Sequence, residues 1–273
     1  MRSYMTETSY TSGQTRELKI CDTHAHLNFP HFNRDRKRIL EEIDSGKIVF
    51  TIEVGTNMDD SKAAVELAKA NRHIFASVGV HPHDSDEVPS DYIDILKELA
   101  AEKKVVALGE IGLDFYRDLS PKDVQRKVFR EQLLLAQELD MPVIVHVRDA
   151  YYDAYEILRE FEGKLTGVIH AFSGTQEDAL RFKELGFKLG IGGPLTYPKN
   201  KGLREIVKVL PIETFVPETD CPYLPPQPHR GKRNEPYYVR FVVEKISELK
   251  GLSVETCADI LCANAVALFR LNL

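Results

Sequence analysis

Histidine and carboxylate side chains gather at a few points of the sequence, each directly after a short apolar run. His24 and His26 stand two residues apart after the run around Ile20, so in a β-strand both imidazoles would face one side and could bind one metal ion. Further groups of this kind follow other apolar runs: Glu110, His146, His170 and Asp220. Imidazole nitrogens and carboxylate oxygens are the common ligands of catalytic zinc and related divalent ions.

Each of these residues, taken singly, has an ordinary structural explanation. Two histidines at this spacing arise by chance, and a lone histidine or glutamate at a strand end commonly caps a helix or bonds within the core. Their joint pattern is harder to explain in that way, because five predicted strands end in such a group. Glu110 and Asp220 would be very costly to bury without a partner, so both require cations nearby.

Six ligands exceed the three protein ligands and one water of a usual mononuclear catalytic zinc site, so we expect two metal ions. The simplest division gives three residues to one ion, two to the other, and one bridge: His24, His26 and Asp220; His146 and His170; Glu110. Two ions about 3.5–4 Å apart activate water and hold the attacking and leaving oxygens of a displacement. Asp220 is the candidate general base. Imidazoles favour zinc or manganese, whereas carboxylates and phosphate substrates also suit magnesium.

Eight short apolar runs recur along the chain, with room for a helix between consecutive runs. They centre near Ile20, Ile52, Ser77, Ala107, Val145, Val168, Gly190 and Val216. Amphipathic spacing predicts helices at residues 60–70, 91–99 and 123–140, and closing helices after Tyr237. Eight consecutive β/α units without a linker predict one (β/α)8 TIM barrel, with a doubly wound open sheet as the alternative.

A barrel brings the C-terminal ends of all its strands to one rim, where the catalytic residues of this fold lie. The predicted ligands follow the strands and would therefore meet there. Residues 18–273 are predicted to form this single hydrolase domain. Residues 1–17, rich in Ser, Thr and Tyr, are predicted to be a mobile extension.

The net charge of −6 argues against bulk attraction to nucleic acid or anionic membranes, although a local basic patch can still form. The sequence has neither a run of about 20 apolar residues nor a signal-peptide pattern. Its four cysteines form no CxxC pair and no disulfide framework. We therefore expect a cytoplasmic protein with no membrane association and no obligate protein partner.

The sequence resembles the TatD family of metal-dependent hydrolases and deoxyribonucleases, within the amidohydrolase-like TIM barrels. The matching stretches run in order along the predicted barrel: DTHAHL, GVHPH, GEIGLDFY, PVIVHVRDA, GVIHAFSG, ETDCPYLPP, RGKRNEPYYV and ANAVALF. The resemblance implies the same ligands that the strand ends indicate. Val147 and Cys221 depart from the common family pattern, and neither is a predicted ligand.

Substrate contacts are expected from five residues around the ligands: His81, His83, Arg148, Arg230 and Arg233. Arg230 and Arg233 follow the eighth strand closely, and arginine binds phosphate in bidentate fashion. The alternative is a solvated loop in which Arg233 pairs with Glu235 or another acid. His81 and His83 share a face after the third strand, where substrate contact is favoured over metal binding because six ligands already suffice.

Family resemblance implies hydrolysis of DNA phosphodiester bonds by a metal-activated water, as in a deoxyribonuclease of the exonuclease type. The first alternative is an amidohydrolase that cleaves a C–N or carboxylic ester bond of a small molecule. Such enzymes commonly bridge their ions with a carboxylated lysine, where this sequence has Glu110. The second alternative is a non-catalytic nucleic-acid-binding or scaffold protein, which would not need six convergent ligands.

Overall fold

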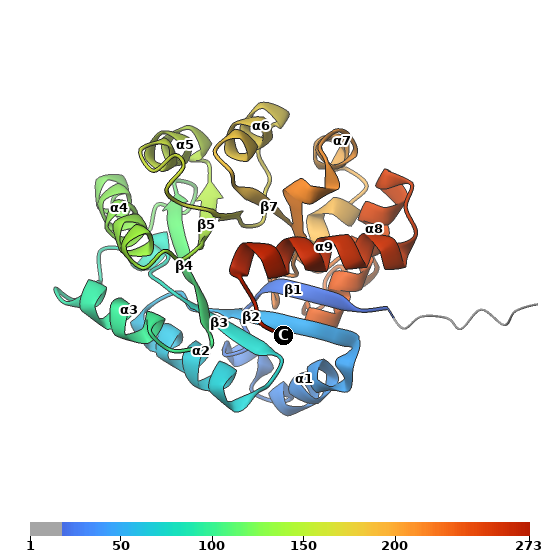
Figure 1. Cartoon of the computed structure of the whole chain (residues 1–273), viewed down its shortest axis with the longest axis horizontal. Coiled ribbons are helices and arrows are strands. Elements are labelled where there is room, and N and C mark those ends of the chain that lie inside the picture. The colour runs from blue at the N-terminus through green and yellow to red at the C-terminus, as the bar shows by residue number, and fades with distance from the viewer. Residues whose placement is uncertain (1–17) are drawn as a thin grey trace, which may run out of the picture.

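Figure 1 shows the computed structural model, which describes residues 18–273 as a barrel of eight parallel strands. The strands are β1 (Ile20–Ala25), β2 (Ile48–Val54), β3 (Ile74–Val78), β4 (Val105–Asp114), β5 (Val143–Arg148), β6 (Gly167–Ile169), β7 (Lys188–Ile191) and β8 (Phe215–Pro217). Each pairs with the next in chain order. All eight predicted strand centres fall inside these strands, which confirms the TIM barrel. The predicted extension at residues 1–17 lies outside the described residues.

Helices cover the outside of the barrel between consecutive strands, and two more helices follow the last strand (Figure 1). They are α1 (Arg36–Glu42), α2 (Met58–Ala70), α3 (Tyr92–Ala100), α4 (Lys122–Glu138), α5 (Tyr151–Arg159), α6 (Gln176–Glu184), α7 (Lys201–Val209), α8 (Val239–Lys250) and α9 (Val254–Phe269). The predicted helices at 60–70, 91–99 and 123–140 correspond to α2, α3 and α4, and the predicted closing helices are α8 and α9.

Short helical turns connect several of these elements. The 3₁₀ turns are Pro30–Phe32, Pro82–Asp84, Gly193–Thr196, Ile212–Thr214, Gln227–His229 and Pro236–Tyr238, and a π turn spans Ile43–Lys47. Among residues 18–273 no single helix has the length and apolar character to cross a membrane. One sharply bent pair of helical segments, Pro236–Lys250 and Val254–Phe269, is long and apolar enough only when the two segments are counted together.

The last and first strands close the barrel through buried polar contacts rather than a full ladder of backbone hydrogen bonds. An isolated bridge joins Ala25 to Cys221 just beyond β8. The Asp22 carboxylate accepts the Thr219 amide at 2.8 Å and the Thr219 hydroxyl at 2.6 Å. The Asp220 amide donates to the His24 carbonyl at 2.9 Å. The closure therefore runs through the same residues that carry predicted ligands.

Apolar side chains fill the inside of the barrel and are closed off by α9. Buried residues of seven strands and of the C-terminal segment form one cluster: Cys21, Phe50, Ile52, Val54, Phe75, Ala107, Ile144, Val168, Val216, Ala265, Leu268, Phe269 and Leu271. In Figure 1 α9 crosses the end of the barrel beside β1, with which it is in contact. A second, larger cluster packs the helices against the outer faces of the strands. The barrel is thus packed through its interior, which leaves its carboxyl end for a site.

Asn264 anchors α9 to the foot of β8, because its side-chain amide donates to the carbonyls of Ile212 and Phe215, both at 2.9 Å. Asn264→Ala leaves two carbonyls at this buried position without that donor. We expect it to lower the free energy of unfolding by about 1–3 kcal/mol, measured by urea denaturation. The exposed Asn272→Ala is the matched control. A destabilisation no larger than that of the control would show that α9 is held by apolar packing alone.

Candidate metal centre

The six predicted ligands converge at the carboxyl end of the barrel. Each stands on a strand or directly after one, and the structure brings all of them into one cluster: His24, His26, Glu110, His146, His170 and Asp220. The Nε2 atoms of His24 and His26 face one another at 3.1 Å. The six side chains therefore converge as their positions at strand ends predicted. Their role as metal ligands stays a prediction.

Glu110 lies between two groups of imidazoles and turns one carboxylate oxygen toward each. Its Oε2 is 3.4 Å from His24 Nε2 and 3.8 Å from His26 Nε2. Its Oε1 is 2.8 Å from His146 Nδ1 and 3.6 Å from His81 Nε2. A carboxylate in this position has the arrangement that a bridge between two ions requires.

His170 lies between the two groups rather than beside His146 alone. Its ring stacks on His24 with centroids 3.5 Å apart, whereas the His146 centroid is 6.4 Å away. Its Nε2 is 3.8 Å from Asp220 Oδ1 and 3.9 Å from Glu110 Oε1. The ring distances thus place His170 nearer to His24 than to His146, and its assignment to the same ion as His146 stays a prediction.

The donor set fits a divalent cation. Three groups have ligand atoms that all lie within 4.8 Å of one another: His24, His26 and Asp220; His81, Glu110 and His146; His24, His170 and Glu218. Each combines imidazole nitrogen with carboxylate oxygen, which suits zinc or manganese. The second group includes His81, for which the sequence predicted substrate contact.

The carboxylates of the centre are held in their charged form by their neighbours. Burial raises the pKa of Glu110, but His81 and the other imidazoles outweigh it and hold that pKa well below its usual range. Burial likewise opposes ionisation of Asp220, yet His170 and His26 lower its pKa. Burial lowers the pKa of His26, whereas Asp220 and Glu110 raise it to about 9. Buried negative charge here is therefore matched by positive charge, which a bound metal ion would supply in place of protons.

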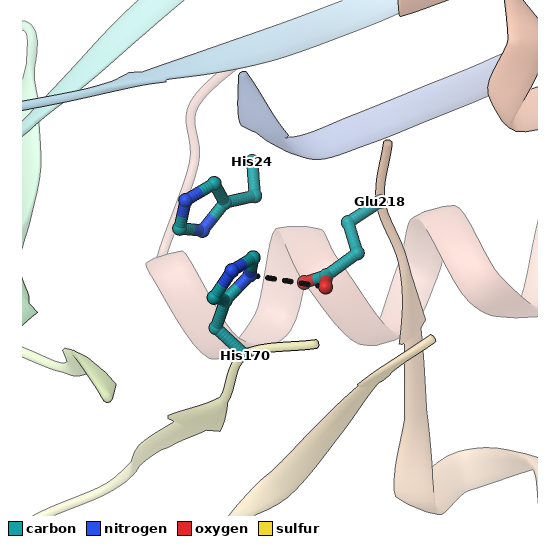
Figure 2. Close-up of side chains that lie close together, drawn as sticks. All are labelled: His24, His170 and Glu218. Atoms are coloured by element: carbon teal, nitrogen blue, oxygen red, sulfur yellow. Dashed lines mark ion pairs between the residues drawn. The ribbon is translucent and has the colours of Figure 1, made fainter. Parts of the chain in front are cut away.

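Glu218 is a residue that the sequence reasoning left without a role. Figure 2 shows its carboxylate directed at the His170 ring. The side chain is buried, and its Oε1 lies 3.0 Å from His170 Nδ1. It also accepts the Ala171 amide at 2.7 Å. Gly190 on β7 leaves room for it, because a Cβ there would lie 2.2 Å from Glu218 Oε2. Glu218 therefore holds the Nδ1 side of the ring and leaves Nε2 directed at the centre.

Asp114, the last residue of β4, has a similar place beside His146. Its Oδ2 is 2.7 Å from His83 Nε2 and 3.3 Å from His146 Nε2, while its Oδ1 accepts the amides of Tyr116 and Arg117. Burial raises its pKa, but His146 and His83 draw it far down. The only sequence signal was its presence in the GEIGLDFY stretch, four residues after Glu110.

A cavity of about 700 Å³ opens above the centre, and three of the five predicted substrate-contact residues line it: His81, His83 and Arg148. Arg230 and Arg233 are not among its lining residues. Arg230 lies over the Tyr197 ring at 4.2 Å. Arg233 binds both oxygens of Asp35 at 2.7 Å and Glu235 at 2.8 Å, which agrees with the alternative that it shapes its loop.

Comparison with known proteins gives a consistent result. The family model described as TatD related DNase matches residues 21–270. The uncharacterized metal-dependent hydrolase YabD of Bacillus subtilis is 42% identical over 255 residues, covering 93% of this chain and 100% of that protein. The 3'-5' ssDNA/RNA exonuclease TatD of Pantoea ananatis is 35% identical over 92% of this chain and 99% of its own. The solved structure of YJJV, a TatD homolog from Escherichia coli K12, superposes with a TM-score of 0.87 at 30% identity and covers 93% and 98% of the two chains.

Glu218→Ala should weaken metal binding without removing a predicted ligand, because the His170 ring loses the group that fixes its orientation. We expect the affinity for zinc or manganese, measured by titration calorimetry, to fall about 10- to 100-fold. Glu218→Gln keeps the shape and should weaken binding less. The ¹⁵N resonances of His170 in the metal-free protein report its tautomer directly, with the exposed Glu184→Gln as control. Unchanged affinity and an unchanged tautomer in Glu218→Ala would contradict the positioning role.

Proposed function

The chain belongs to the TatD family of metal-dependent hydrolases, and from this membership we propose that it cleaves phosphodiester bonds of nucleic acid as a deoxyribonuclease of the exonuclease type. The observation that carries the proposal is Glu110, whose two oxygens face separate groups of imidazoles. A carboxylate that turns one oxygen toward each of two positions can hold two ions side by side, as a two-ion hydrolase requires. The relative from Pantoea ananatis, named as a 3'-5' ssDNA/RNA exonuclease, supports the choice of nucleic acid as substrate.

We propose two divalent ions, of zinc, manganese or magnesium. His24, His26 and Asp220, whose ligand atoms lie within 4.8 Å of one another, would hold one ion. His146 with His170 would hold the other, with Glu110 between the two sets. His81, at 3.6 Å from Glu110 Oε1, is an additional ligand for the second ion. Bound divalent ions would neutralise phosphate charge, and a zinc ion lowers the pKa of its bound water from 15.7 to about 7.

The protein's own residues would accept the proton and position the substrate. Asp220 Oδ1 lies near three imidazoles, which leaves Oδ2 to accept a proton from the attacking water. The low pKa of Asp220, set by His170 and His26 against the effect of burial, keeps this oxygen unprotonated at neutral pH. Arg148 and His83 line the cavity and would contact the phosphate from the side of β3 to β5.

An amidohydrolase activity on C–N bonds is less well supported by the site. The described residues that line the cavity include no lysine, so a bridge of carboxylated lysine has no candidate there. Solved barrels of that broader kind, such as a dihydroorotase at 16% identity and a TM-score of 0.61, share the fold alone. A cytoplasmic location stays a prediction that rests on the cysteine pattern.

Glu110→Ala and Asp220→Ala should each abolish hydrolysis of a p-nitrophenyl phosphodiester and of DNA at saturating metal. Both carboxylates serve the metal centre rather than apolar packing, so the unfolding transition should remain cooperative. Asp59→Asn, at a carboxylate that is 97% exposed, is the control and should keep wild-type turnover. Wild-type-like turnover in either site variant would exclude the proposed bridge or base.

The metal content of histidine variants tests whether two ions are divided between the ligands as proposed. Atomic absorption should give about two ions per chain, on the two-metal template. His146→Ala should bring this to one or fewer, and His24→Ala should empty the other site. His73→Ala removes a histidine outside the cluster, where its ring contacts the Val49 carbonyl, and should keep both ions. One tight ion in the wild type, unaffected by His146→Ala, would show the division to be wrong.

A further inference from the structure

Glu53, on β2, is a buried carboxylate to which the proposed function gives no role. Its side chain is fully buried, and it forms no ion pair among residues 18–273. Its two oxygens instead accept backbone amides, Oε2 that of Leu27 at 2.7 Å and Oε1 that of Asn28 at 2.8 Å. Burying a carboxylate without a cation is costly, and an apolar side chain of similar size would fill the position at lower cost. We therefore expect Glu53 to have a role beyond packing.

The backbone that Glu53 binds comes directly after the predicted ligand His26. The register of β1 and β2 places Ala25 beside Glu53, so the Glu53 side chain reaches the amides two and three residues further along. Val54, the next residue of β2, has its carbonyl oxygen 3.0 Å from His26 Nδ1. The end of β2 thus contacts both the ring of His26 and the backbone that follows it.

Arg36, the first residue of α1, binds the same two residues through their carbonyl groups. Its Nε donates to the Leu27 carbonyl at 2.7 Å, and its Nη2 donates to the Asn28 carbonyl at 2.9 Å. The two amides are therefore bound by Glu53 and the two carbonyls by Arg36. We call this pair of charged side chains the clamp, because together they fix all four backbone polar groups of residues 27–28.

The clamped backbone leads back to the metal centre at both of its ends. On one side stands His26, whose Nε2 is 3.5 Å from Asp220 Oδ1. On the other side stands Phe29, whose ring stacks on the His26 ring with centroids 4.6 Å apart and lines the cavity. A shift of residues 27–28 would therefore move a predicted ligand and the ring packed on it. Metal sites depend on such outer contacts, which hold ligands in place before the ion arrives.

We propose that Glu53 is a positioning residue for the predicted ligand His26, acting with Arg36 on the backbone that follows it. The inference rests on the proposed function, because it takes His26 as a ligand of the first ion. Glu53 would act on the backbone of its ligand, whereas Glu218 contacts the ring of His170. Its burial without a cation is then explained, since only an acceptor with two oxygens can bind both amides.

Amide hydrogen exchange in the metal-free protein tests the clamp without reference to metal or activity. In Glu53→Ala the amides of Leu27 and Asn28 lose their buried acceptor, and we expect both to exchange about 10- to 100-fold faster. Glu53→Gln keeps the shape but only one acceptor oxygen. One of the two amides should then stay protected while the other exchanges faster.

Metal affinity separates positioning from a general loss of stability. Titration calorimetry with zinc should show the first ion bound about 10- to 100-fold more weakly in Glu53→Ala. Asn264→Ala is the matched control, because it removes buried hydrogen bonds at the amino end of the barrel and should keep wild-type affinity. Arg36→Met removes the hydrogen bonds to the two carbonyls and should weaken the same ion, but less. Lys37→Met, at a neighbouring side chain that is 91% exposed, should have no effect.

Unchanged exchange of the two amides in Glu53→Ala, or a loss of affinity no larger than that of Asn264→Ala, would overturn this inference. If Glu53→Ala does not fold, Glu53→Gln and Arg36→Met provide the same two comparisons. If the wild type hydrolyses DNA in spite of such a result, the proposed function stands without the clamp. A protein that hydrolyses no phosphodiester but loses metal affinity in Glu53→Ala would support the positioning role and reject the proposed function.

Discussion

The buried carboxylate of Glu110 constrains which residues can surround it, because a negative charge buried in the mouth of a barrel must be matched by cations. Its two oxygens face imidazoles on both sides. Those rings are held from behind: Glu218 contacts His170, Asp114 contacts His146, and the Val54 carbonyl lies 3.0 Å from His26 Nδ1. An outer layer of acceptors thus leaves one nitrogen of each ring directed inward, where a metal would be held.

The sequence predicted the barrel and the gathering of ligands because both depend on short-range patterns. Apolar runs mark the strands, and a side chain directly after a parallel strand must reach the carboxyl rim. Contacts set by distant partners were not predictable in this way. Arg233 was expected at phosphate, but Asp35, 198 residues earlier, takes its guanidinium. Glu218 stands two residues before a predicted ligand, yet only the three-dimensional arrangement shows that it meets His170.

The two ends of the barrel differ in structure: the amino end is closed by apolar packing, and the carboxyl end holds the candidate site. At the amino end α9 and its leucine and phenylalanine side chains complete an apolar core, and Asn264 binds that helix to β8. At the carboxyl end Ala171 and Asp220 adopt positive φ angles of 44° and 58°, a conformation that costs a non-glycine residue of order 1–3 kcal/mol. Such backbone strain persists only where the surrounding structure enforces it. The apolar packing at the amino end thus offsets the cost of the strained backbone at the carboxyl end, where the candidate site lies.

The closure between β8 and β1 also determines when the centre can exist during synthesis. The hydrogen bond from Thr219 to Asp22 joins residues 197 apart, and it lies beside the predicted ligands His24, on β1, and Asp220, just after β8. A ribosome that adds about 5–20 residues per second needs roughly 10–40 s to make the second partner after the first. During that interval the nascent chain holds His24 and His26 without Asp220. The centre can therefore assemble only after the chain has been made as far as β8 and Asp220, and the seam between β8 and β1 makes this assembly a late step that coincides with closure of the barrel.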